Sequence, residues 1–369
     1  MMDCDVLVIG GGPAGSSLAL ALASTELSVI LIERSKKSSF KVGESLIASV
    51  NSMLKELKVW NILSDYDHLP SFSSAASWGS PALIYNDFIH QGQSNGWHLD
   101  RRQFDHQLLK EVKKKNVSVL EGCYLENVSQ DSSQKWLIDV QKDKKVISLG
   151  ARFIADCSGR LSAFTNRIGI HRIKIDSLIA LWGVFSPNSG CSDQNATAVV
   201  EAEEDGWWHQ SLLPSGDRIV SLFTDFDHPN IKDFKKKENF LSKLNRTFHI
   251  SKSLENYTWK SPLRPHGESA ESSRLQRITG PNWLAVGDAA MTFDPMSSQG
   301  IPNAMFSGIE AARALTNAFN GQSDSLDKYE QIMEGIWSRY LVRISELYKS
   351  ERRWPQSHFW SRRHRGLKS

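Results

Sequence analysis

A glycine-rich turn near the N-terminus constrains the fold more than any other part of the sequence. The apolar run Val6–Ile9 leads into Gly10, Gly12 and Gly15, and an Ala/Leu-rich helical pattern follows. In a strand–turn–helix unit, Gly10 allows a tight turn, Gly12 lets a pyrophosphate approach bare backbone, and Gly15 lets the helix pack close to the sheet. The sequence therefore predicts a dinucleotide site at this turn.

The residues around the turn complete the pattern. The predicted helix begins with Pro13 and Ala14, and its free N–H groups and positive dipole end face the phosphates. A second predicted strand over 27–32 delivers Glu33, followed by Arg34, about twenty residues beyond the turn, where a carboxylate accepts ribose hydroxyls. Glu33 and Arg34 are therefore predicted cofactor contacts.

Composition limits the classes of protein to which the chain can belong. It has 369 residues, 40% hydrophobic and 23% charged, as in a globular protein of two joined domains with a terminal helical piece. The first strand begins almost at once and no apolar run reaches the ~20 residues of a membrane span, which predicts a cytosolic protein away from membranes. A net charge of +3 does not indicate nucleic-acid binding. The cysteines are far apart without a CxxC spacing, so reduced buried thiols and no metal site are expected at Cys4, Cys123, Cys157 and Cys191.

Two polar turns follow the nucleotide motif. A loop over 34–45 ends in Gly43, Glu44 and Ser45, and it either covers the cofactor or merely connects two elements. A later strand ends in Asp156-x-x-Gly159, which is a second turn dominated by backbone groups.

Between these turns the pattern predicts strands over 61–100 and then a helix capped by Asp100. Arg101, in the first turn of that helix, either reaches a phosphate or is a solvated surface arginine. A predicted hairpin, 136–140 with 146–154, precedes the second turn.

Residues 173–265 have mostly two-residue periodicity, which predicts a sheet-rich insertion with one helix over 231–248. Trp207, Trp208 and His209 stand out within it. Such residues form either a core or the wall of a pocket for an aromatic substrate.

The last third returns to the nucleotide-binding domain. A buried strand closes on Gly287 and Asp288, whose carboxylate can hold a polyol hydroxyl, and a loop over 292–300 enters a helix over 301–319. Amides of 297–300 can stabilise negative charge on a bound cofactor. A final helix over 325–353 ends in a basic, aromatic segment that either docks a partner or folds back on the chain's own surface. The residues in question are Arg352, Arg353, Trp354, Phe359, Trp360, Arg362 and Arg363.

Taken in order, these motifs resemble the FAD-dependent aromatic hydroxylase superfamily, and Gly43-Glu44-Ser45 with the 294–300 loop narrows the resemblance to the branch of the tryptophan halogenases. The resemblance implies that Glu33 binds the adenosine ribose, Arg101 the phosphates and Asp288 the ribityl-pyrophosphate region. The full set of implied FAD contacts is Gly10, Gly12, Pro13, Ala14, Gly15, Glu33, Arg34, Gly43, Ser45, Arg101, Asp156, Gly287, Asp288, Pro295, Ser298, Gln299 and Gly300.

The same resemblance implies the fold class. An α/β fold is expected, with a Rossmann-like FAD-binding domain of the aromatic hydroxylase/glutathione reductase type, a β-sheet-rich substrate domain and a C-terminal helix. The expected boundaries are 1–65, 100–172 and 266–324 for the FAD-binding domain, 66–99 and 173–265 for the substrate domain, and 325–369 for the C-terminal helix and basic tail.

Two departures from the halogenase pattern matter. Halogenases carry Trp-x-Trp-x-Ile-Pro and a lysine that relays hypohalous acid, whereas this chain has Gly206-Trp-Trp-His-Gln-Ser-Leu-Leu-Pro214 and no lysine around Ser77-Trp-Gly-Ser80. The chain is more similar to the LodB/GoxB-like flavoproteins, which accompany quinoprotein amino-acid oxidases and are needed to build cysteine tryptophylquinone.

That resemblance implies an FAD monooxygenase that hydroxylates a tryptophan side chain in an oxidase precursor, using O2 and an external reductant. Hydroxylation or reduction of a free small molecule and a non-catalytic FAD-containing maturation chaperone are the alternatives. Because the cofactor supplies the reactive oxygen, the protein mainly orients the substrate and keeps the pocket dry. The expected positioning groups are Glu44, Trp78, Trp207 and His209, with His209 either a base or a hydrogen-bonded wall residue.

Overall fold

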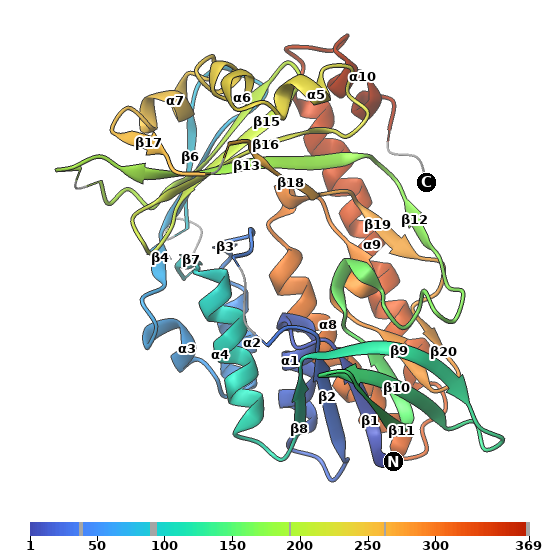
Figure 1. The fold of residues 1–369 in the computed structure, drawn as a ribbon. Coiled ribbons are helices and arrows are strands. Elements are labelled where there is room, and N and C mark those ends of the chain that lie inside the picture. The colour runs from blue at the N-terminus through green and yellow to red at the C-terminus, as the bar shows by residue number, and fades with distance from the viewer. Residues whose placement is uncertain (37–39, 89–93, 192, 262, 367–369) are drawn as a thin grey trace.

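The computed structural model describes residues 1–36, 40–88, 94–191, 193–261 and 263–366. Two large sheets dominate it, one above the other in Figure 1. Parts of the predicted 34–45 loop, of the 66–99 segment and of the C-terminal tail lie outside the described residues.

The lower sheet is the nucleotide-binding one. Its strands follow the order β20-β21-β11-β1-β2-β8, in which β21, β11, β1, β2 and β8 are parallel to one another, while β20 is antiparallel to β21 and β10 is antiparallel to β11. Parallel strands buried on both faces are continuously apolar, as in the Val-Leu-Val-Ile end of β1. Its strands are β1 (Met2–Ile9), β2 (Val29–Glu33), β8 (Ser118–Glu121), β9 (Cys123–Gln130), β10 (Trp136–Lys142), β11 (Lys145–Asp156), β20 (Thr279–Gly280) and β21 (Trp283–Ala285).

Three helices pack beside this sheet: α1 (Pro13–Leu22), α4 (Arg101–Lys113) and α8 (Gly300–Phe319). The predicted cap of α4 is confirmed, since the Asp100 carboxylate accepts a hydrogen bond from the Gln103 amide at 3.0 Å. Helices α1 and α8 approach very closely, because a Cβ on Gly308 would lie 2.6 Å from the Ala14 carbonyl oxygen. This contact fixes the middle of α8 against the first turns of α1.

The upper sheet comes from two separated parts of the sequence. Its order is β17-β13-β16-β15-β14-β5-β6, with β18 also paired to β13. Its strands are β5 (Ser73–Ser77), β6 (Ile84–Asp87), β13 (Leu178–Pro187), β14 (Ala198–Glu203), β15 (Gly206–Leu212), β16 (Arg218–Asp225), β17 (Tyr257–Trp259) and β18 (His266–Ser269). One face packs against helices in a separate apolar cluster, and the other faces the nucleotide-binding half (Figure 1).

The prediction of one helix over 231–248 is wrong. The structure has two short helices there, α5 (Ile231–Phe234) and α6 (Lys237–Leu244), and a third, α7 (His249–Ser253), begins just after this range. The helical path is interrupted between α5 and α6 at Lys236, because the backbone of this residue is extended, with φ −86° and ψ 135°. A periodic apolar pattern continues across such a break, so the sequence did not reveal it.

Small elements join the two halves. A three-stranded sheet combines β3 (Ser45–Leu46), β4 (Leu69–Ser71) and β7 (Gly96–His98), and α2 (Val50–Glu56) and α3 (Asn61–Ser64) lie between β3 and β4 in the sequence. Another small sheet combines β12 (Arg172–Lys174), β19 (Ser273–Leu275) and β22 (Met291–Thr292). These strands carry the chain between the nucleotide-binding sheet and the upper sheet.

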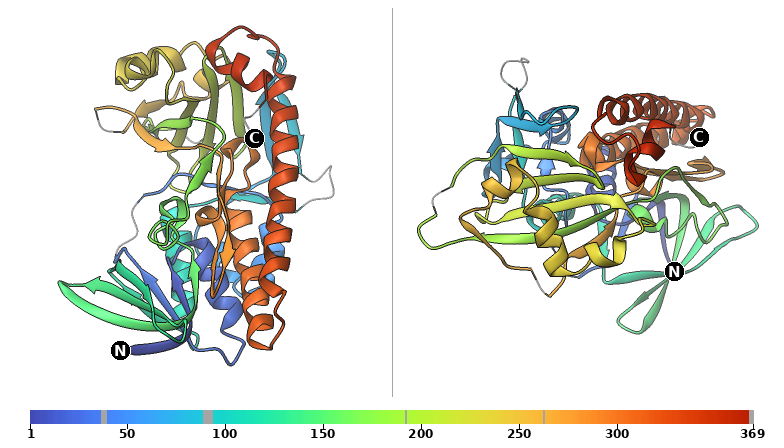
Figure 2. Two further views of the ribbon diagram at one scale, coloured as in Figure 1. Left: turned by 90° about the vertical axis from the view of Figure 1, so that its right-hand side faces the viewer. Right: turned by 90° about the horizontal axis from the view of Figure 1, so that it is seen from above.

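A long helix, α9 (Ser325–Ser350), extends from the lower half to the upper half, and α10 (His358–His364) then turns back onto the upper sheet (Figure 2, left). Phe359 and Trp360 are fully buried, and the Trp360 indole N–H donates to the Glu203 carbonyl at 2.8 Å. Of the two interpretations of the basic, aromatic tail, folding back on the chain's own core is therefore the one that the structure supports.

No helix among the described residues is long and apolar enough to cross a membrane.

Candidate functional site

The glycine turn has the geometry expected of a phosphate site. Gly10 has φ +110°, and a Cβ there would lie 2.5 Å from the Cys157 carbonyl oxygen. A Cβ on Gly15 would lie 1.9 Å from the Gly10 carbonyl oxygen, so the helix start and the turn are in direct contact. At Gly12, by contrast, a Cβ would meet no atom of the described chain within 4 Å. The open side of the turn is therefore at Gly12, where a pyrophosphate needs space.

Glu33 lies at the end of β2, directly beside this turn. One carboxylate oxygen accepts a hydrogen bond from the Gly11 amide at 2.7 Å, and the other accepts from the Ser35 amide at 2.8 Å. The side chain is half-buried, so it keeps an accessible edge. Arg34, the next residue, is exposed. Binding of a ribose by Glu33 stays a prediction that fits this placement.

Asp156, at the end of β11, has a structural role that differs from the expected contact with the cofactor. Its carboxylate is fully buried and accepts hydrogen bonds from the backbone of Ser158, Phe164 and Thr165 and from two hydroxyl groups. A carboxylate with so many internal donors is not available to a cofactor. Asp156 therefore shapes the turn, and the expectation of direct FAD binding by its side chain is corrected.

Gly287 and Asp288 form a turn of 3-10 helix, Gly287–Ala289, next to α1. Gly287 has φ +62°, and a Cβ there would lie 2.8 Å from the Ala14 methyl carbon. The Asp288 side chain is 38% exposed and lies 3.8 Å from Arg160 Nε. This carboxylate is thus available at the surface of the turn, as expected for a group that binds a polyol hydroxyl.

Two arginines beside Asp288 were not predicted. Arg172 donates hydrogen bonds to the Asp288 and Ala289 carbonyls at 2.7 and 2.8 Å, and Arg160 faces the Asp288 carboxylate. Arg160 directly follows Gly159, so the sequence could have revealed its role through the position of a cation immediately after the second turn. Arg172 had no such signal, because it reaches the turn from β12.

Arg101 holds the loop that precedes Glu44. Its guanidinium donates to the Val42 and Gly43 carbonyls at 3.1 and 3.2 Å and pairs with Asp105 on the same helix at 3.2 Å. Its side chain is only 13% exposed, so it is not the solvated arginine of the alternative interpretation. Its contact with a phosphate stays a prediction.

Glu44 and His209 come together beneath the upper sheet. His209 Nδ1 lies 3.7 Å from Glu44 Oε1, and the Ser211 hydroxyl donates to the same carboxylate oxygen. The Gly43 amide donates to the other oxygen at 3.1 Å. His209 and Ser211 project from one face of β15 because side chains two residues apart share a face of a strand. The predicted pair is therefore assembled by two segments 165 positions apart (209 − 44).

Burial sets the protonation of this pair. It lowers the pKa of the His209 imidazole, and the nearby Glu44 carboxylate only partly offsets that shift. Burial opposes ionisation of Glu44, but His209 and the Ser211 hydroxyl outweigh it, so the pKa of Glu44 is lowered. A neutral imidazole beside a carboxylate can accept a proton at Nε2, the nitrogen not facing Glu44.

Trp207 and Trp78 both pack against the C-terminal part of the chain. Trp207 is 1% exposed, stacks on Phe223 with 3.9 Å between ring centroids, and donates its indole N–H to the Tyr348 hydroxyl at 3.1 Å. Trp78 donates to the Leu347 carbonyl at 2.9 Å and contacts the rings of Tyr348 and Trp360. Both tryptophans support the C-terminal helices, which corrects the expectation that they position substrate.

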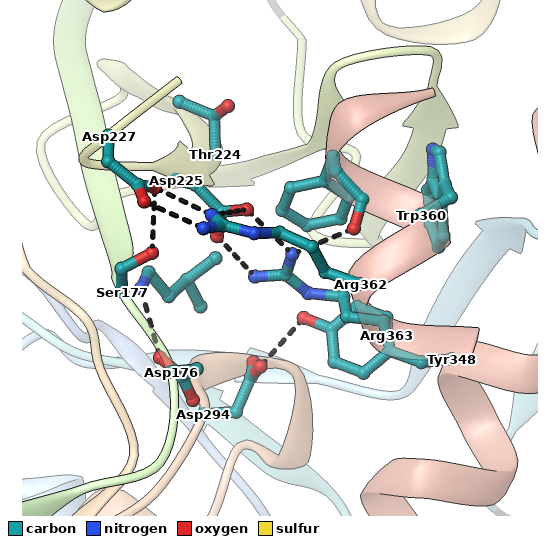
Figure 3. Close-up of polar contacts among 12 residues, drawn as sticks. Asp176, Ser177, Thr224, Asp225, Asp227, Asp294, Tyr348, Trp360, Arg362 and Arg363 are labelled. Atoms are coloured by element: carbon teal, nitrogen blue, oxygen red, sulfur yellow. Dashed lines mark hydrogen bonds and ion pairs between the residues drawn. The ribbon is translucent and has the colours of Figure 1, made fainter. Parts of the chain in front are cut away.

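A buried network then leads to the 295–300 loop (Figure 3). The Tyr348 hydroxyl, which accepts from Trp207, donates to Asp294 Oδ2 at 2.6 Å, while Asp294 Oδ1 accepts from the Met296 amide at 2.9 Å. Burial raises the pKa of Asp294 to about 6. Asp294 therefore ties α9 to the loop, and sequence reasoning placed no role on it because its partners come from distant segments.

Figure 3 also shows Arg363, which attaches α10 to the upper sheet. Its guanidinium forms two hydrogen bonds to the Asp225 carboxylate at 2.8 and 3.2 Å, and both side chains are almost fully buried. It also lies 3.4 Å from the Phe359 ring centroid. Arg362, next to it, pairs with Asp227 at 2.6 Å. These cations are used inside the molecule and are not free to dock a partner.

The loop itself is a short turn of 3-10 helix, Pro295–Ser297, followed by Ser298 with φ +51°. Gly300 begins α8, and a Cβ there would meet no described atom within 4 Å. The Ser45 hydroxyl, in the predicted Gly-Glu-Ser segment, is buried without a hydrogen-bond partner among the residues that the structure describes. An unpaired buried hydroxyl and open glycine faces are what a missing polar ligand leaves behind.

Comparisons with known proteins agree with this geometry. Residues 3–341 match the model of the family described as FAD binding domain. The chain belongs to this family. It is an FAD-dependent oxidoreductase. The glycine turn, Glu33, Asp288, Ser45 and the 295–300 loop stay the predicted cofactor contacts, and the open face of Gly12 and the unpaired Ser45 hydroxyl are compatible with that prediction.

Individual relatives extend over nearly all of the flavoprotein. It is 28% identical, over an alignment of 372 residues that covers 99% of this chain and 98% of the relative, to the FAD-dependent oxidoreductase LodB of Marinomonas mediterranea. Its fold is similar to that of the myxobacterial FAD-dependent halogenase CndH, with TM-score 0.89, 22% identity and coverage of 98% and 86% of the two chains. It is also similar to QhpG, a peptidyl tryptophan dihydroxylase essential for tryptophylquinone cofactor biogenesis, with TM-score 0.78, 20% identity and coverage of 100% and 80%. The predicted resemblance to LodB-like flavoproteins is confirmed.

Proposed function

We propose that this flavoprotein hydroxylates a tryptophan side chain in the precursor of a quinoprotein amino-acid oxidase, during biogenesis of its cysteine tryptophylquinone. The observation that carries the proposal is the Glu44–His209 pair beneath a sheet wall that contains no lysine. None of the eight strands of the upper sheet has a lysine. Similarity to LodB along the whole chain and the fold shared with QhpG support the same substrate class.

The chemistry needs few protein groups. Reduced FAD, when bound, supplies the activation of O2. An indole carbon that receives oxygen must then lose its proton, and the proposed acceptor is His209 Nε2. Glu44 faces Nδ1 at 3.7 Å and stabilises the imidazolium that forms, while Ser211 holds the Glu44 carboxylate in place.

The test uses the FAD-loaded protein, the purified oxidase precursor, O2 and a chemical reductant. Peptide mass spectrometry should find added oxygen on a tryptophan of the precursor. His209→Gln should retain FAD and lower the rate roughly 100-fold, since general-base catalysis contributes about 10²–10⁴-fold. The exposed histidine variant His106→Gln is the matched control and should be unaffected.

Three results would contradict the proposal. If oxygen appears only on a free small molecule, the substrate class is wrong. If His209→Gln matures the precursor at the normal rate, the base has been assigned wrongly. If the precursor matures without reductant or flavin turnover, the protein is a chaperone and not a hydroxylase.

A further inference from the structure

A groove lies between the start of α8 and one face of α9, and one end of it borders the 295–300 loop. Its cavity has a volume of about 260 Å³, below the ~300–1,000 Å³ of typical small-molecule sites. Its apolar floor comes from one side of α9, where positions three, four and eight apart share a face. These floor residues are Ile336, Ile344 and Leu347. The space suits one apolar side chain more than a whole free ligand.

Two cations stand at the edge of the groove. Arg339 and Arg343 lie one helical turn apart on α9, line the cavity and are exposed. Like charges at this spacing destabilise a helix, and neither forms an ion pair with a carboxylate within the described ranges. Other arginines of the C-terminal half do pair, as Arg353 does with Glu351 and Arg362 with Asp227. The exposed pair is thus complementary to an anionic partner.

The end of the groove carries an unsatisfied donor. The side-chain nitrogen of Asn303, in the first turn of α8, is buried and has no hydrogen-bond partner among the described residues. A buried donor without an acceptor is costly, and a peptide carbonyl would satisfy it. Ser297 and Gln299 of the 295–300 loop line the same end, so an occupant would touch the loop that borders the predicted flavin site.

We propose that the α8–α9 groove binds an acidic peptide segment of the protein substrate, with an apolar side chain on the floor, a backbone carbonyl at Asn303 and carboxylates at Arg339 and Arg343. The identity of this partner rests on the proposed function; the binding of an acidic peptide does not. The basic C-terminal tail is less suited to this role, because its Phe359, Trp360 and Arg363 side chains are buried.

The test measures fluorescence anisotropy of a fluorescein-labelled peptide with one central tryptophan flanked by aspartates, titrated with the FAD-loaded protein. The double variant Arg339→Glu/Arg343→Glu should bind the peptide roughly tenfold more weakly, because two exposed attractions become repulsions. Lys349→Glu, which removes an exposed cation elsewhere on α9, is the matched control and should change the affinity less than twofold. Added salt should weaken wild-type binding more than binding by the double variant.

Several outcomes would overturn the proposal. The proposal fails if the acidic peptide does not bind, or if a lysine-flanked peptide binds with the same affinity. It also fails if Lys349→Glu weakens peptide binding as much as the double variant does. Competition by free tryptophan or acetate as effective as that by the peptide would assign the groove to a small carboxylate. Thermal unfolding checks that the exposed substitutions leave the fold intact.

Turnover of the oxidase precursor separates this inference from the proposed function. Peptide binding that depends on Arg339 and Arg343, without any oxidation of the precursor, would support the groove and refute the hydroxylase. If the double variant oxidises the precursor at the wild-type rate, the hydroxylase proposal is supported and the groove proposal is refuted.

Discussion

Gly12→Ala isolates cofactor binding from folding more cleanly than any other substitution in the site. Gly12 has φ −73° and ψ −171°, which alanine adopts without strain, and its Cβ would meet no described atom within 4 Å. The apoprotein should therefore keep its stability. With FAD, the same methyl group occupies space that the pyrophosphate needs, so a phosphate oxygen is displaced from the backbone amides.

The expected size follows from the bonds lost. A hydrogen bond to a charged group contributes about 1.5–3 kcal/mol, and loss of one such bond, about 2 kcal/mol, weakens FAD binding roughly 30-fold. Titration of the apoprotein with FAD, followed by flavin fluorescence, gives the Kd, and urea unfolding of the apoprotein gives the stability.

Gly15→Ala is the contrasting variant. Its Cβ would lie 1.9 Å from the Gly10 carbonyl oxygen, so the backbone must shift and stability should fall by about 1–3 kcal/mol or more. If Gly12→Ala bound FAD within threefold of wild type, or destabilised the apoprotein as much as Gly15→Ala, the assignment of the open side of the turn would be wrong.

Three further predictions concern chemistry and stability. With bromide, reduced flavin, O2 and a tryptophan peptide, mass spectrometry should find no brominated product; bromination would refute the lysine argument. The pKa of Asp294 is raised by burial to about 6 from an ordinary 3.8, so its ionisation should lower the unfolding free energy by ~3 kcal/mol between pH 3 and 7. Urea unfolding should show this loss in wild type and not in Asp294→Asn; equal slopes would contradict it. Arg363→Met should cost about 3 kcal/mol by leaving Asp225 short of its cation, whereas exposed Arg365→Met should stay within about 0.5 kcal/mol; equal losses would refute the anchor.

The parts of the fold that could be predicted are those whose signals are local. The glycine turn, β1, α1 and the capped helix α4 follow from residues within one or two turns of each other. The helix breaks after Phe234 and Leu244 could not be predicted, because apolar periodicity does not report a single extended residue such as Lys236.

For the site too, the residue types could be predicted from local sequence, but their arrangement in space could not. Glu44 and His209 were identified as residue types worth attention, but only the register of β15 places them 3.7 Å apart. Asp156 was assigned to the cofactor through the family resemblance, whereas its internal donors come from residues two to nine positions later. The role of Asp294 depends on its hydrogen bond with Tyr348, which in turn is bonded to Trp207. These residues are too far apart in the sequence to form a recognisable pattern.

The attachment of α10 to the upper sheet also imposes an order on biosynthesis. Both sheets and the 295–300 loop leave the ribosome before Arg363 is added, and until then Asp225 is a buried carboxylate without its main cation. A buried charge without a partner destabilises the structure around it. A nascent chain stalled ahead of α10 therefore holds its upper sheet weakly and is exposed to proteases and chaperones.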